Sequence, residues 1–98
     1  MNRQQLIERS EQYLRELLRA SLPAHTPVHL FGSRARRDAR WNSDYDLWID
    51  CNLDPMTLNM IAETIEESFV PFGVDIITTP QLKGKFGALV HKEAMRWM

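Results

Sequence analysis

The sequence has one cysteine, no long apolar run and almost no net charge, and each shortage excludes a class of protein. Cys51 alone cannot form an internal disulfide, which favours a reducing compartment. Charged side chains are spread through the first twenty residues, so neither a signal peptide nor a membrane-spanning segment is predicted. Twelve basic against thirteen acidic residues leave a net charge of −1, which excludes a polycation that coats nucleic acid. We therefore expect a cytoplasmic protein with no membrane contact, for which nucleic acid is an unlikely direct ligand.

Two common kinds of functional motif are also missing. No GxxxxGK[ST] stretch exists, so a P-loop is excluded. The three histidines and the cysteine have no zinc-ligand spacing. The chain has 98 residues, so we expect residues 1–98 to form a single domain with one modest core.

Apolar periodicity and turn residues predict alternating helices and strands. A helical stripe covers 3–21 and stops before Pro23, and an apolar strand covers 28–31. A short helix is predicted for 33–39, a turn for 41–43 and a second strand for 44–50. The Asp54-Pro55 pair is typical of a helix start, and helical spacing continues from Leu58 to Phe69.

The last third of the chain predicts one more strand and one more helix. A third strand covers 74–78, and Thr79-Pro80 starts a final helix. Its buried stripe is expected to contain Leu82, Phe86, Leu89 and Val90. The order αβ(α)βαβα predicts an α/β (α+β) fold with a small mixed sheet flanked by helices.

Two aspartates on the second predicted strand are the first candidate site residues. Asp44 and Asp46 are two positions apart, so they share one face of the strand, about 6.6 Å apart along it. Asp44 alone is ordinary turn chemistry. Asp46, however, lies inside an apolar strand, where a lone charge needs a partner. A bridging divalent cation explains both carboxylates together.

Asp75 in the third strand is the third candidate. If the second and third strands are neighbours, Asp75 faces the other two acids and completes a three-carboxylate site. It could then act as the general base that takes a proton from an attacking hydroxyl. An aspartate near a strand start is also common without any function.

A Gly-Ser pair precedes the two aspartates by ten residues. Gly32 permits a tight turn, and Ser33 can open a helix whose N–H groups point at a phosphate. Arg34 and Arg36 could engage a triphosphate. Pairing of one of these arginines with a surface acid is the alternative.

These residues resemble a known family. The signature Gly32-Ser33, ten intervening residues, then Asp44-Tyr45-Asp46, with Asp75 as third acid, is similar to that of the minimal nucleotidyltransferases of the polymerase-beta-like superfamily. The resemblance implies the polymerase-beta-like nucleotidyltransferase fold. One departure is Arg37, where many relatives have a glycine. If that glycine permits a turn, Arg37 must adopt the turn at some cost, or the loop differs.

The resemblance also implies an activity. Such proteins transfer AMP from ATP to a hydroxyl with Mg²⁺, and many are antitoxins that modify a tyrosine of a HEPN-domain toxin. Asp44, Asp46 and Asp75 would then be catalytic and hold two metals, while Gly32, Ser33, Arg34 and Arg36 would bind the nucleotide. Transfer to a small molecule or RNA, and neutralisation by contact without catalysis, are the alternatives.

Overall fold

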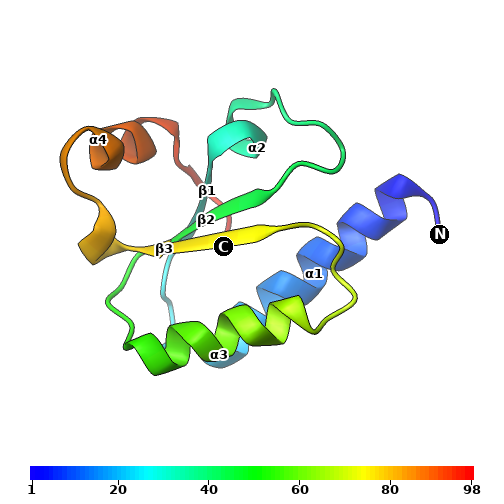
Figure 1. Cartoon of the computed structure of the whole chain (residues 1–98), viewed down its shortest axis with the longest axis horizontal. Helices are drawn as coiled ribbons and strands as arrows, with labels where there is room; N and C mark the ends of the chain where they lie inside the picture. Colours follow the sequence, from blue (N-terminus) through cyan, green and yellow to red (C-terminus); the bar gives the residue numbers. More distant parts are fainter.

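Four strands form one mixed sheet, with helices on both of its faces (Figure 1). The computed structural model describes all residues from 1 to 98. The elements are α1 (Arg3–Ser21), β1 (Val28–Phe31), α2 (Gly32–Arg36), β2 (Tyr45–Ile49), α3 (Pro55–Glu66), β3 (Val74–Thr78), a 3-10 turn (Thr79–Gln81), α4 (Gly84–Glu93) and β4 (Met95–Arg96). The mixed sheet flanked by helices confirms the predicted fold class.

The strand order is β3-β2-β1-β4, which places β1 and β2 at the centre. β1 runs antiparallel to β2 and β4, whereas β2 and β3 are parallel. The two strands that carry the candidate acids are therefore neighbours, as the three-carboxylate interpretation requires. Helices α1 and α3 cover one face of the sheet, and α2 and α4 lie on the other (Figure 1).

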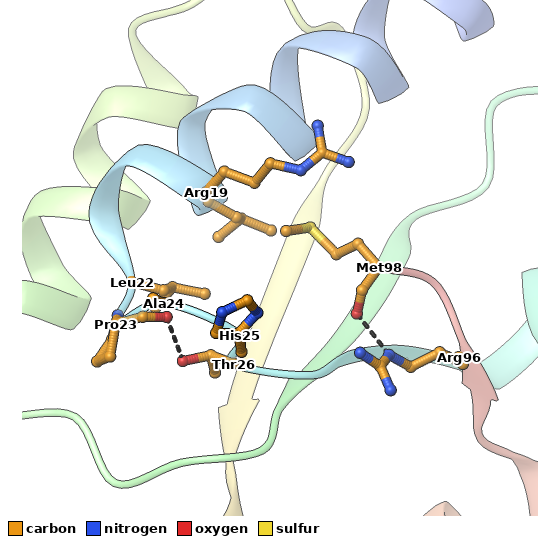
Figure 2. Close-up of a pocket in the computed structure, with 9 residues that line it drawn as sticks. Arg19, Leu22, Pro23, Ala24, His25, Thr26, Arg96 and Met98 are labelled. Carbon is orange, nitrogen blue, oxygen red and sulfur yellow. Dashed lines mark hydrogen bonds between the residues drawn. The ribbon is translucent and has the colours of Figure 1, made fainter.

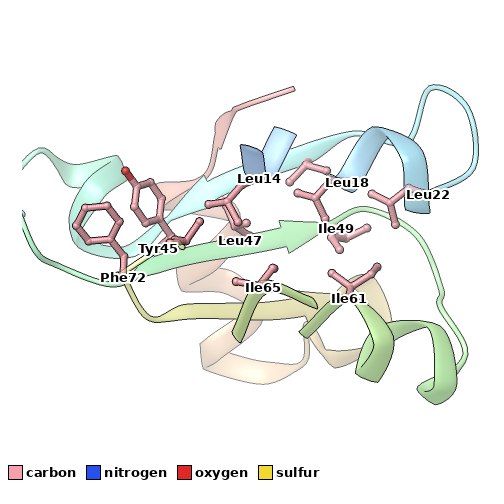
Figure 3. Packing of buried hydrophobic residues seen from close by; sticks show 11 residues of the cluster. Leu14, Leu18, Leu22, Tyr45, Leu47, Ile49, Ile61, Ile65 and Phe72 are labelled. Carbon is pink, nitrogen blue, oxygen red and sulfur yellow. The ribbon is translucent and has the colours of Figure 1, made fainter. Parts of the chain in front are cut away.

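The main core lies between the sheet and the pair α1 and α3 (Figure 3). Tyr45, Leu47 and Ile49 alternate along β2 and are fully buried on this side. The stripe of α1 places Leu14 and Leu18 against them. Because apolar side chains fill this face, the alternate positions of β2 are left for the opposite face, where Asp46 lies.

The observed helix boundaries agree only in part with the predicted ones. Asp54 caps α3 as predicted, because its carboxylate accepts the N–H of Thr57. The helix ends at Glu66, however, so Phe69 lies beyond it and is exposed. Helix α2 begins one residue earlier than expected and ends at Arg36.

The last helix differs most from its prediction. Thr79-Pro80 starts only a 3-10 turn, and α4 begins at Gly84. Val90 is buried as expected, whereas Phe86 and Leu89 are about half exposed, so their assignment to a buried stripe was wrong. Two further residues then pair with β1 as β4, a strand that the sequence did not predict.

No helix of the structure has the length and the apolar character needed to cross a membrane.

His29 on β1 provides a pH-dependent contribution to stability. Its ring stacks on Trp48 with centroids 4.5 Å apart, and its buried Nδ1 has no hydrogen-bond partner. Burial lowers the pKa of His29 below 6.5, Asp50 opposes this, and Arg96 and His91 add to it. Between the native and unfolded pKa values the unfolded chain binds more protons, so the free energy of unfolding falls as the pH drops below 6.5.

We therefore expect His29→Phe to reduce this loss of stability in acid. Urea unfolding of the parent and the variant at pH 7.5 and pH 5 measures the slope of the free energy of unfolding against pH. The other titrating groups are common to both proteins, so a difference in slope is due to His29. His25→Phe is the matched control, because His25 is exposed. Equal slopes for all three proteins would contradict the expectation.

Candidate functional site

The carboxylate of Asp46 packs against the turn between β1 and α2. Gly32 follows Phe31 with a φ of 72°, a conformation that side chains rarely adopt. A Cβ atom built on Gly32 would collide with Oδ2 of Asp46 and lie 3.1 Å from its Cγ. Glycine is required here for two reasons, namely the left-handed backbone and the carboxylate packed against it.

The other two acids lie on β3 and in the residue just before β2. Asp46 and Asp75 are register partners in the β2–β3 ladder, so their side chains leave the same face of the sheet. Asp44 precedes β2, and its Oδ1 would lie 2.6 Å from a Cβ on Gly73, the residue before β3. The three predicted acids thus lie at one end of β2 and β3, and Gly73 is a site residue that sequence reasoning missed.

The electrostatics of the cluster centre on Asp46. Burial raises the pKa of the Asp46 carboxyl, and the negative charges of Asp75 and Asp44 raise it further. Arg36 opposes the rise, and Glu93 adds weakly to it. Asp46 is half-buried, whereas Asp44 and Asp75 are exposed. A cation would relieve this repulsion between like charges.

The donor set suits a hard divalent cation such as Mg²⁺, because all three ligating groups are carboxylates. The tight seating of Asp46 over Gly32 and of Asp44 over Gly73 fixes two of the three groups. No group of three or more His, Cys, Asp and Glu side chains converges closely enough to form a metal site as it stands. The metal site therefore stays a prediction.

Ser33 lies next to this cluster, in the first turn of α2. It is partly exposed, and its backbone carbonyl accepts the N–H groups of Arg37 and Asp38. The helix has only five residues, so the end of this helix by itself is no anion site. The role of Ser33 in nucleotide binding remains a prediction.

Arg34 points toward the loop before β2. Its Nε and Nη2 donate to the carbonyl of Ser43 at 3.0 and 2.7 Å, and Nη2 also donates to the carbonyl of Trp41 at 3.0 Å. Its guanidinium carbon lies 3.9 Å from the centroid of the Tyr45 ring. These contacts hold the loop that carries Asp44, a role that no sequence signal indicated.

Arg36 is paired with acids, which was the alternative left open for one of the two arginines. Its Nη1 lies 2.6 Å from Glu93 and its Nε 3.1 Å from Asp38. The pairing with Glu93 raises the pKa of the Arg36 guanidinium. Because the side chain is exposed, it remains accessible to a phosphate, and this role stays a prediction.

The backbone of Arg37 shows how the loop accommodates a residue other than glycine. It caps α2 in the left-handed conformation, with a φ of 65° and a ψ of 27°, and its N–H donates to the Ser33 carbonyl. A residue other than glycine is strained in this conformation by about 1–2 kcal/mol. The loop therefore makes a left-handed turn without a glycine, and Arg37 adopts it under strain.

We expect Arg37→Gly to raise the free energy of unfolding by about 1 kcal/mol, because glycine is the preferred residue at such a cap. The gain is less than the full strain, since glycine also has more freedom to lose on folding. Thermal and urea unfolding measure the change. Arg40→Gly is the control, because Arg40 is exposed in the same loop and has no left-handed backbone. A gain in the control as large as in Arg37→Gly would contradict this explanation.

Two hollows of the surface have charged side chains in their walls. One, of about 410 Å³, lies beyond the end of α1 and has Arg19, His25, Arg96 and Met98 among its lining residues (Figure 2). Val28, which follows it, pairs with Ile49, so this hollow is at the opposite end of β1 and β2 from Asp46. The other, of about 430 Å³, lies between α3 and β3 and reaches Asp75.

Comparison with known proteins supports the fold. No protein-family model matches the chain, and no curated protein matches its sequence. A solved toxin–antitoxin structure with AMP-PNP matches with a TM-score of 0.71 and 23% identity over 89% of this chain and 72% of that chain. The MntA-HepT toxin–antitoxin structure matches with a TM-score of 0.66 and 22% identity, covering 92% and 71%.

A third solved structure is that of a tri-AMPylated Shewanella oneidensis HEPN toxin in complex with an MNT antitoxin. It matches with a TM-score of 0.67 and 20% identity, covering 92% of this chain and 71% of that chain. At such identities the likeness establishes a shared fold, and the chemistry of this chain must be argued from its own residues.

Proposed function

We propose that this chain is a Mg²⁺-dependent nucleotidyltransferase that moves AMP from ATP to a hydroxyl of a HEPN-domain toxin and thereby acts as an antitoxin. The observation that carries the proposal is the placement of Asp44, Asp46 and Asp75 at one end of two neighbouring strands. The shared fold with MNT antitoxin complexes, one of which contains an AMPylated toxin, supports it.

The proposed reaction joins the acceptor oxygen to the α-phosphorus of ATP. The bond between the α-phosphorus and the bridging oxygen breaks, and pyrophosphate leaves. When bound, Mg²⁺ supplies positive charge that neutralises the phosphate oxygens and the leaving group. Asp44, Asp46 and Asp75 would hold it.

The residues of the chain contribute position and proton transfer. Gly32 makes room for the Asp46 carboxylate at the turn, where Ser33 would bind the β- and γ-phosphates. Asp75 would accept the proton of the attacking hydroxyl, because it is the most exposed position of the strand pair and can reach an incoming acceptor. Arg34 keeps the Asp44 loop in place through the Ser43 carbonyl.

Transfer of label tests the proposal. The protein is mixed with ATP labelled at the α-phosphate, Mg²⁺ and a HEPN-domain protein, and the label on each polypeptide is followed by gel electrophoresis and mass spectrometry. We expect label on a tyrosine of the HEPN-domain protein, and none when EDTA is present. ATP binding without transfer to the protein would contradict the proposal, as would uptake of label by aminoglycosides or tRNA instead.

A non-catalytic antitoxin is the second candidate. It is favoured by the absence of a ready-made group of three metal-ligating side chains and by the strained Arg37 turn. A double variant, Asp44→Ala with Asp46→Ala, separates the two candidates in cells that express the toxin. Full neutralisation by the double variant supports contact alone, whereas loss of neutralisation with normal protein levels supports catalysis.

A further inference from the structure

The outer edge of β3 is an unpaired strand edge beside the acid cluster. β3 is the first strand in the order β3-β2-β1-β4 and pairs only with β2. The carbonyl of Gly73 accepts the N–H of Tyr45 at 2.8 Å, so the backbone groups of Gly73 face β2. Since this direction alternates along a strand, the backbone of Asp75 also faces β2.

Val74 and Ile76 therefore direct their N–H and C=O groups away from the sheet. The backbone N–H and C=O groups of Val74 and Ile76 form no hydrogen bond with a loop, a turn or a side chain. The edge has no lysine, proline or bulge, which are three of the features that prevent strand pairing. It is thus a short template for one more strand.

A groove of mixed polar and apolar lining accompanies this edge. The hollow of about 430 Å³ between α3 and β3 has Ile65, Val70, Phe72 and Val74 in its wall, together with the acids Glu66 and Asp75. Neither acid has a salt bridge, because the three ion pairs of the structure lie elsewhere. The groove exposes polar and apolar surface in about equal measure and carries negative charge at its margin.

We infer that the acceptor is presented by an extended segment of the partner polypeptide that pairs with the outer edge of β3. This inference rests on the proposed function and specifies how the substrate docks. Only a polypeptide offers backbone donors and acceptors at the spacing of Val74 and Ile76. The residue opposite Asp75 would share its face of the sheet, with the Cβ atoms about 5 Å apart.

The register then specifies the kind of segment. A hydroxyl-bearing residue lies opposite Asp75, and apolar residues on either side of it point to the opposite face, toward the groove beside α3. A basic residue near them would meet Glu66. An acidic segment is disfavoured, because Glu66 and Asp75 already carry unpaired negative charge.

Hydrogen exchange tests the docking mode directly. The probe is the polypeptide that takes up label in the transfer experiment, bound to the Asp46→Asn variant so that the complex does not react. We expect the amide hydrogens of Val74 and Ile76 to exchange at least about tenfold more slowly in the complex. The amides of Asp75 and Ile77, which face β2, are the internal control. A complex in which Val74 and Ile76 exchange as in the free protein overturns the inference.

A charge reversal provides a second test without touching the strand. Glu66→Lys is expected to raise KM for the protein acceptor about tenfold and to leave KM for ATP unchanged. Glu63→Lys is the matched control, because Glu63 is exposed on the same helix but does not line the groove. Equal KM values for the two variants would overturn the inference. If both variants still transfer label, the proposed function is retained. Failure of the docking inference can therefore be told apart from failure of the proposed function.

Discussion

Replacement of Asp46 by asparagine is expected to abolish nucleotidyl transfer and, at the same time, to stabilise the free protein at neutral pH. Asparagine keeps the shape of the side chain but removes the negative charge that a metal ion requires. Loss of one preorganised electrostatic contact lowers a rate by about a hundredfold or more. We expect at least this loss in the label-transfer assay.

The stability gain follows from the pKa of Asp46. The native pKa lies above the unfolded value of 3.8, so the native state binds a proton more readily than the unfolded chain. Between these two values the free energy of unfolding falls as the pH rises, and the charged carboxylate remains unfavourable at pH 7. Asparagine removes this penalty, and the gain disappears below pH 3.8, where both states are protonated.

Urea unfolding at pH 7 and pH 3.5 measures this gain, alongside the transfer assay. Asp50→Asn is the matched control, because Asp50 directly follows β2 but lies outside the cluster and accepts the hydroxyl of Thr79. The control should retain transfer. An Asp46→Asn variant that transfers label at the parent rate, or that is less stable at neutral pH, contradicts the assignment of Asp46.

The second large effect is expected for Gly32→Ala. A Cβ at this position enters the space of the Asp46 carboxylate, and a φ of 72° strains any side chain. We expect the free energy of unfolding to fall by at least about 1–2 kcal/mol. Transfer should be lost in the fraction that remains folded, because the added Cβ atom displaces the Asp46 carboxylate.

The variant Gly84→Ala separates the effect of backbone strain from that of the steric clash. Gly84 has a φ of 59°, but a Cβ on it would meet no atom within 4 Å. This variant therefore carries the backbone strain without the clash. We expect a smaller loss of stability than for Gly32→Ala, measured by thermal unfolding, with normal transfer. If Gly32→Ala and Gly84→Ala behave alike in both assays, the seating of Asp46 over Gly32 has no functional importance.

The sequence predicts which face of β2 carries Asp46, because this follows from period-two alternation. Once Tyr45, Leu47 and Ile49 are buried on one side, Asp46 must leave the other side of β2. At Arg37 the sequence left two outcomes open, a strained turn or a different loop, and the left-handed backbone of Arg37 corresponds to the first.

The missed features depend on contacts between distant segments. β4 exists because Met95 and Arg96 pair with β1, and two residues after a helix contain no strand pattern. The late start of α4 follows from the 3-10 turn, in which Gln81 accepts the N–H of Thr78. Neither the carbonyl partners of Arg34 nor the closeness of Gly73 to Asp44 has any signal in composition or spacing.

The Arg34 contact has a consequence for how this protein can evolve. The guanidinium that holds the Ser43 carbonyl rests on the ring of Tyr45, and the hydroxyl of that tyrosine donates to Glu11 on α1 at 2.8 Å. The N-terminal helix is thereby tied to the loop of Asp44 through a relay of three side chains. We therefore expect positions 11, 34 and 45 to covary among homologues, because a substitution at one of them removes a contact on which the other two depend.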